Sequence, residues 1–128
     1  MSFRKVVFVV VELCLLWSVV LTVLAGLGNS WVLDRVAGGT YAGESMPAGM
    51  RVIYLLSALL SVAVMLIVLR VFSGHAGKLL RALGWVTVVV FALSTLANAM
   101  SSSGPERWNA IPAALVALGT AYLLRTRV

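Results

Sequence analysis

Long apolar stretches alternate with short polar ones along the chain. Apolar stretches cover 6–27, 52–72 and 82–100 with at most one charged residue each, and a fourth stretch follows at 105–124. Crossing about 30 Å of hydrocarbon takes roughly 20 residues at 1.5 Å per residue. The consecutive valines of the first stretch lack the strict alternation of a spanning strand. The pattern therefore predicts four transmembrane helices.

The connections between the stretches indicate the topology. The first, 28–51, contains five glycines, and the second, 73–81, is short. In the third, Ser103 is expected to cap a helix that has Pro105 in its first turn. Short connections join antiparallel neighbours in helix bundles. We predict an all-α, polytopic membrane protein: one domain, 1–128, with four transmembrane helices in an up-and-down bundle.

Pro112 falls inside the fourth predicted helix. Proline lacks an amide donor and its ring clashes with the carbonyl four residues earlier, so we expect a kink near the outer surface. The alternative is a later helix start, which would place Pro112 in the first turn, where no amide donor is needed.

Composition strengthens the membrane assignment. The 128 residues are 62% hydrophobic and 11% charged, whereas about 25% of residues are charged in an average soluble domain. A chain this short cannot hide so much apolar surface from water, which excludes a soluble globular domain. The single cysteine, Cys14, excludes an internal disulfide framework.

The basic residues predict the orientation. The formal net charge is +6, and most basic residues fall on the side of the bundle that holds both termini. The positive-inside rule then places both termini of a multi-pass membrane protein in the cytoplasm. The lipid bilayer is the expected partner of this charge; nucleic acid is not, because no basic cluster alternates with exposed aromatic residues. The terminal side holds Arg4, Lys5, Arg70, Lys78, Arg81, Arg125 and Arg127, and the other side holds Arg35, Arg51 and Arg107.

The long first connection, 28–51, has two interpretations. Its glycines, with Trp31 and Tyr41, are typical of a flexible connector whose aromatic rings rest at the lipid headgroups. The alternative is a lid or partner-binding loop over the outer mouth of the bundle.

Small and hydroxyl-bearing residues recur at three- and four-residue steps, so each predicted helix has one face of them. Such faces let membrane helices approach closely and hydrogen-bond, which predicts inward-facing packing surfaces. The alternative is that they line a polar cleft for a substrate or an ion. The faces are Ser18, Thr22, Ala25 and Asn29; Tyr54, Ser57, Ser61 and Met65; Gly84, Thr87, Phe91, Ser94, Asn98 and Ser101; and Ala113, Ala117 and Ala121.

Glu12 is the one acidic residue within the first three predicted spans. An ionised carboxylate at such a depth costs roughly 2.5–3.5 kcal/mol on insertion scales, so Glu12 should either carry a proton or have partners. The other predicted helices offer the hydroxyl groups of Thr87, Thr120 and Tyr122 at a matching depth. These four residues form a candidate intramembrane proton or ion site.

Two alternatives remain for Glu12. The side chain of Lys5 or Arg70 could extend toward it and form a structural ion pair. Glu12 also lies about 90° around the helix from the centre of its small-residue face, which would turn it toward a second subunit.

A polar motif precedes the last predicted helix. It reads N-x-x-S-x-S-x-x-E-R and consists of Asn98, Ser101, Ser103, Glu106 and Arg107. Serine and asparagine favour helix ends, and a glutamate suits a helix N-terminus. This candidate outer-face motif resembles that of small four-span bacterial integral membrane proteins of uncharacterised function. The resemblance implies a fold and an envelope location, and no activity.

A four-span chain of this length with a glutamate in its first span also resembles the small multidrug resistance transporters. In that family the glutamate binds protons and cationic drugs alternately within a dimer, and Glu12 would be the matching residue. The long first connection and the strong charge bias depart from that pattern. The third span, with Phe91 and Trp85, also lacks a glycine-rich drug site.

Catalytic motifs are absent from the sequence: it has no HExxH, CxxC, Walker loop, GxSxG or haem-ligand histidine pair. The one histidine, His75, has no convergent partners for a metal. We therefore expect no enzyme, cofactor or metal. The sequence favours an accessory or structural membrane protein that acts through contacts with a membrane protein partner or with further copies. The alternative is a small oligomeric proton-coupled transporter or channel that uses Glu12.

Overall fold

The computed structural model describes residues 1–127, which contain helices and no strand. This confirms the all-α prediction. Three helices, α1, α2 and α3, are long and apolar enough to cross a membrane. The elements are α1 (Phe3–Gly26), the 3-10 turns η1 (Ser30–Val32) and η2 (Ala37–Gly39), α2 (Ala48–Phe72), α3 (Lys78–Ala99), α4 (Gly104–Arg107) and α5 (Ala110–Arg125).

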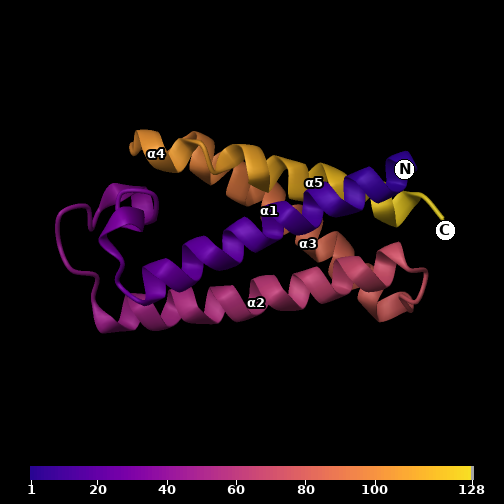
Figure 1. Ribbon diagram of the computed structural model, residues 1–128, viewed down its shortest axis with the longest axis horizontal. Coiled ribbons are helices and arrows are strands. Elements are labelled where there is room, and N and C mark those ends of the chain that lie inside the picture. The colour runs from indigo at the N-terminus through magenta and orange to yellow at the C-terminus, as the bar shows by residue number, and fades with distance from the viewer. Residues whose placement is uncertain (128) are drawn as a thin grey trace.

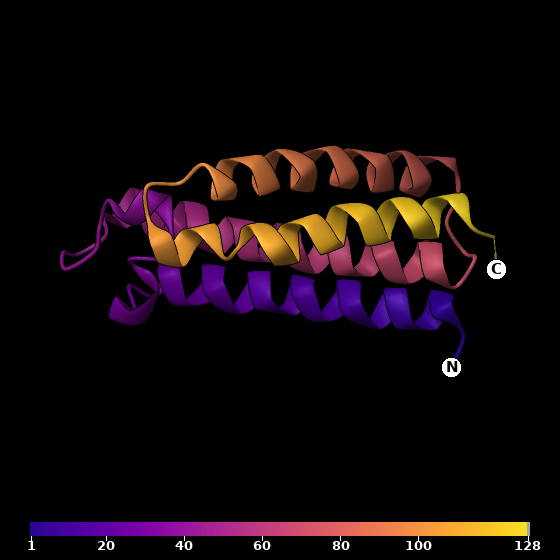
Figure 2. The same cartoon turned by 90° about the horizontal axis from the view of Figure 1, so that it is seen from above.

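The four long helices lie side by side and alternate in direction (Figures 1 and 2). Both termini and the α2–α3 turn lie at one end of the bundle, here called the inner end. The η turns and α4 lie at the other, outer end. Helix α1 packs on α2 and α5, and α3 packs on α5 and α2. Helices α1 and α3 therefore lie diagonally opposite each other (Figure 2).

The prediction of one continuous helix over 105–124 is wrong. The structure divides it into the single turn α4 and the 16-residue helix α5. Because α5 begins at Ala110, Pro112 lies in its first turn, where its missing donor costs nothing. The later helix start, rather than a kink, accommodates this proline. At about 24 Å by helix rise, α5 alone is shorter than the hydrocarbon layer.

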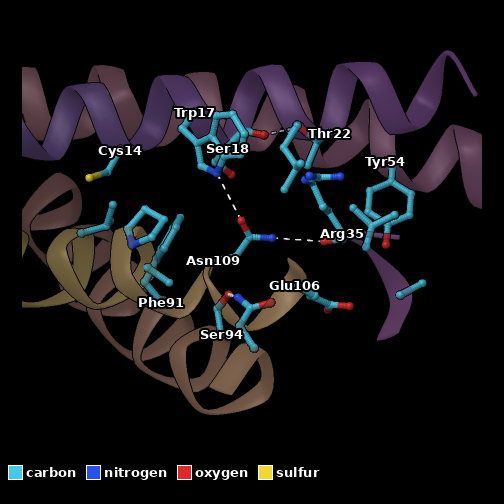
Figure 3. A pocket seen from close by; sticks show the side chains of 17 residues that line it. Cys14, Trp17, Ser18, Thr22, Arg35, Tyr54, Phe91, Ser94, Glu106 and Asn109 are labelled. Carbon is cyan, nitrogen blue, oxygen red and sulfur yellow. Dashed lines mark hydrogen bonds between the residues drawn. The ribbon is translucent and has the colours of Figure 1, made fainter. Parts of the chain in front are cut away.

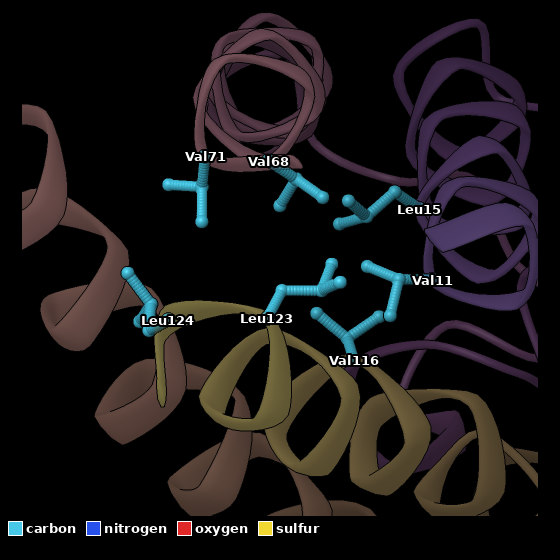
Figure 4. Close-up of a cluster of buried hydrophobic side chains, with 7 residues drawn as sticks. All are labelled: Val11, Leu15, Val68, Val71, Val116, Leu123 and Leu124. Atoms are coloured by element: carbon cyan, nitrogen blue, oxygen red, sulfur yellow. The ribbon is translucent and has the colours of Figure 1, made fainter. Parts of the chain in front are cut away.

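Valine and leucine side chains fill the inner half of the bundle (Figure 4). Gly119 of α5 lets α1 approach, because a Cβ there would lie 2.3 Å from Cγ2 of Val11. On the other side of α5, a Cβ at Gly84 would lie 3.0 Å from Cδ2 of Leu124. The buried cluster comprises Val11, Leu15, Val68, Val71, Val116, Leu123 and Leu124.

Three arginines bind the C-terminal carbonyls of neighbouring helices. A cation is favourable there because the last carbonyls of a helix are unpaired and carry partial negative charge. The charge pattern of the sequence predicted only a role in membrane orientation for these arginines. The structure shows that they also cap helix C-termini. Arg4 donates to the carbonyls of Phe72 (2.6 Å) and Val71 (3.2 Å), Arg51 to those of Gly26 (2.9 Å) and Leu27 (3.1 Å), and Arg81 to that of Leu124.

Candidate functional site

Residues 27–47, here called the outer cap, fold onto the outer end of the bundle. Apolar side chains of this segment, among them Val32 of η1, pack onto α1. The outer cap therefore covers the outer end of the bundle and shares a small apolar core with α1. The buried cluster comprises Leu21 and Ala25 of α1 with Val32, Leu33, Val36 and Met46 of the cap.

The polar motif before the last helix holds the outer cap in place. Ser103 caps α4 as predicted, because its Oγ accepts from the amide of Glu106 at 3.4 Å. The same hydroxyl donates to the carbonyl of Asp34 in the cap. Oε2 of Glu106 accepts from the cap amide of Gly38 and from Oγ of Ser101, the latter at 3.3 Å. The motif thus joins two segments far apart in sequence.

The other two residues of the motif lie outside this contact. Asn98 donates to Oγ of Ser94 at 3.3 Å, one turn earlier on α3. Arg107 is exposed. The structure therefore brings together Ser101, Ser103 and Glu106.

Asn109 forms a second link between the bundle and the outer cap (Figure 3). Its Oδ1 accepts from Nε1 of Trp17 at 3.2 Å, and its Nδ2 donates to the carbonyl of Arg35 at 3.1 Å. Because Asn109 lies in the turn between α4 and α5, the break in the predicted helix frees this side chain. Sequence reasoning missed this residue. The proline three positions later was the available signal.

A cavity of about 190 Å³ lies between the helices beneath the outer cap (Figure 3). All four long helices line it, together with Arg35, Val36 and Ala37 of the cap and Glu106 of α4. Its wall combines aromatic rings, hydroxyl groups and amides. The helix residues are Cys14, Trp17, Ser18, Leu21, Thr22, Tyr54, Phe91, Ser94, Asn98, Pro112, Ala113 and Val116, and Asn109 lies in the α4–α5 turn.

The predicted polar face of α3 serves two purposes. In the inner half, Gly84 and Thr87 are buried, and Thr87 donates to the carbonyl of Leu83 at 3.0 Å. In the outer half, Phe91, Ser94 and Asn98 line the cavity. Packing therefore accounts for one half of this face and a polar cleft for the other.

One ion pair lies beside the cavity, and it is the only one within residues 1–127. Nη1 of Arg35 lies 2.7 Å from Oδ1 of Asp34. The guanidinium carbon of Arg35 lies 4.1 Å above the ring of Trp31, an arrangement in which the ring face attracts the cation. The charge of Arg35 is thus compensated within the outer cap.

The residues predicted around Glu12 do not form a hydrogen-bonded site. Oε1 of Glu12 and Oγ1 of Thr120 are both buried without a partner among the described residues. Thr87 lies on α3, diagonally across the bundle, and its hydroxyl binds its own helix. The ring of Tyr122 packs edge-to-face on Phe3 at 5.2 Å. Nor does Lys5 or Arg70 form an ion pair with Glu12.

Residues 1–127 contain no group of three or more His, Cys, Asp or Glu side chains that could hold a metal ion. No protein-family model matches the chain, and no curated protein or solved structure is detectably similar to it.

Proposed function

We propose that the chain is a multi-pass protein of the bacterial cytoplasmic membrane with both termini in the cytoplasm. Three helices of sufficient length and hydropathy support insertion. The excess of basic residues at the inner end supports the orientation. The fourth crossing is made by α5, with the α4 turn at the outer membrane–water interface.

Within that membrane, we propose that the protein is an accessory bundle that acts by binding a membrane protein partner rather than by catalysis. The observation that carries this proposal is the outer cap. Joining α2 to α3 takes only residues 73–77, whereas residues 27–47 join α1 to α2. Helix connections in bundles need only about 2–8 residues, and longer ordered loops are usually functional.

The outer cap also has the composition of a recognition surface. Trp31 of the cap and Trp108 beside it are exposed, as is Arg107. Tryptophan and arginine are enriched among the residues that dominate protein interfaces. Hydrogen bonds from Ser103 and to Glu106 fix this surface before any partner arrives, which reduces the entropy lost on binding.

Photo-crosslinking tests the proposal. A photoreactive amino acid would replace Trp31 or Trp108 and, as controls, the exposed mid-helix residues Leu59 or Leu93. We expect one recurrent protein adduct from the two outer positions and none from the controls. The absence of a protein adduct at the outer positions, or equal adducts from all four, would contradict the proposal.

A proton-coupled transporter or channel that uses Glu12 is the second candidate. The observation that favours it is the buried Oε1 without a hydrogen-bond partner, because an intramembrane acid with no structural partner is a functional candidate. A second copy of the chain could supply the missing partner. Glu12→Gln should abolish proton movement in proteoliposomes, with Glu44→Gln in the exposed outer cap as the control. Unchanged flux in Glu12→Gln would contradict this candidate.

A further inference from the structure

We propose that the cavity beneath the outer cap is a binding site for a small organic cation, an ammonium group carried on an apolar body about the size of a benzene ring. Glu12 is not among the residues that line this cavity, so the site is separate from the candidate proton site. It also does not depend on the partner proposed for the outer surface of the cap.

Charge is the first argument. Arg35 and Glu106 are the charged residues that line the cavity. Asp34 lies 2.7 Å from Arg35 and compensates its charge. Glu106 has no ion-pair partner within residues 1–127, so these three residues together carry one uncompensated negative charge. The half-buried carboxylate of Glu106 is less solvated than a fully exposed one and therefore attracts a cation more strongly.

The carboxylate also keeps the capacity to bind a ligand. Both of its hydrogen bonds, from Gly38 and Ser101, go to Oε2. Oε1 therefore retains its lone pairs for an ammonium donor. The two existing bonds hold the group in place, so its orientation does not depend on the ligand.

Aromatic rings from three helices supply the second argument. Trp17, Tyr54 and Phe91 belong to α1, α2 and α3 and line the same cavity (Figure 3). Ring faces attract cations, and tryptophan does so best. The hydroxyl oxygens of Ser18 and Ser94 can accept further hydrogen bonds from ammonium N–H groups. A carboxylate, three rings and acceptor oxygens together match an organic ammonium ion better than an inorganic cation or an anion.

Size restricts the ligand further. The cavity measures about 190 Å³, and an engineered protein cavity of about 150 Å³ binds benzene. A benzene-sized body with one ammonium group therefore fits. Benzylammonium is a suitable probe, with benzyl alcohol and benzoate as neutral and anionic probes of similar size.

Calorimetric titration of the full chain in lipid nanodiscs tests the proposal, with empty nanodiscs as the blank. We expect saturable 1:1 binding of benzylammonium. Benzyl alcohol and benzoate should bind at least about tenfold more weakly, because they cannot donate a charge-assisted hydrogen bond to the carboxylate and such a bond is stronger than a neutral one. Absence of saturable benzylammonium binding would overturn the proposal. So would equal affinity for either of the other probes. This comparison uses the unmodified chain and does not depend on the folding of a variant.

Variants then locate the site. Glu106→Gln keeps an oxygen acceptor for Gly38 and Ser101 but removes the charge, and it should weaken benzylammonium about tenfold or more. Glu44→Gln removes an exposed carboxylate of the outer cap that does not line the cavity, and it should leave the affinity unchanged. Equal weakening by both variants would indicate general surface attraction and overturn the assignment to this cavity.

Discussion

The carboxylate of Glu106 accepts a hydrogen bond from the backbone amide of Gly38, which lies 68 positions earlier in the chain. The contact joins the single-turn helix α4 to the 3-10 turn η2 of the outer cap. Gly38 has φ +66°. Residues with a Cβ adopt this left-handed backbone conformation at a cost of roughly 1–2 kcal/mol. The contact between the cap and α4 therefore depends on a glycine in the loop and an acid beside the last helix.

Ser103→Ala should open the outer cap. The substitution removes the cap of α4 and the hydrogen bond to the carbonyl of Asp34, and loss of a helix cap alone costs about 1 kcal/mol. Limited proteolysis within 27–47 should accelerate several-fold. Ser45→Ala, at an exposed position of the same loop, is the control. Equal cleavage rates in the two variants would contradict the expectation that Ser103 holds the cap against the bundle.

Gly119→Ala should destabilise the bundle, since the new Cβ would lie 2.3 Å from Val11. Valine has one strongly preferred rotamer in a helix and cannot easily turn away. Overpacking of this kind costs typically 1–3 kcal/mol. Gly49→Ala is the matched control, because a Cβ there meets nothing within 4 Å and alanine favours a helix. The midpoint of thermal unfolding in detergent should fall for the first variant and hold or rise for the second.

The sequence predicted the helices well because hydropathy and helix rise are local properties. Gly84 marked a helix contact for the same reason, since close approach needs a missing side chain. Gly119 also permits a close contact, but it lies outside the small-residue face predicted for its helix. The break before Pro112 depended on a choice between two starts of one helix, which local propensity does not decide. The partners of Glu106 and Asn109 lie in the outer cap. Their pairing follows from how a glycine-rich loop folds back, and no periodic pattern encodes that.

Within residues 1–127, no hydrogen bond joins Glu12 to the residues predicted as its partners. A common depth in the membrane is necessary for contact, but helix order around the bundle is also required. Thr87 lies on the helix diagonally opposite α1 (Figure 2), and a helical wheel of one span carries no information about which neighbour it meets.

Labelling with a membrane-impermeant thiol reagent should find Ser45 and Ser73 on opposite sides of the membrane. Both residues are exposed, one in the outer cap and one in the α2–α3 turn, so a cysteine at either position should react from its own side. The native Cys14 would first be replaced by alanine. Labelling of both positions from the same side of intact cells would contradict the crossing of α2 between them.

Arg4→Met and Lys5→Met provide a test that separates helix capping from membrane orientation. Each variant removes one positive charge from the inner end, so each should weaken the orientation signal equally. Arg4 also binds the last carbonyls of α2 at 2.6 and 3.2 Å and lies 4.9 Å from the ring centre of Phe72, whereas the Lys5 side chain is exposed. A cation at a helix C-terminus contributes about 0.3–1 kcal/mol, and more when partly buried. The midpoint of thermal unfolding should therefore fall for Arg4→Met alone. An equal fall in both variants would mean that these residues stabilise the protein through their positive charge and not through specific contacts.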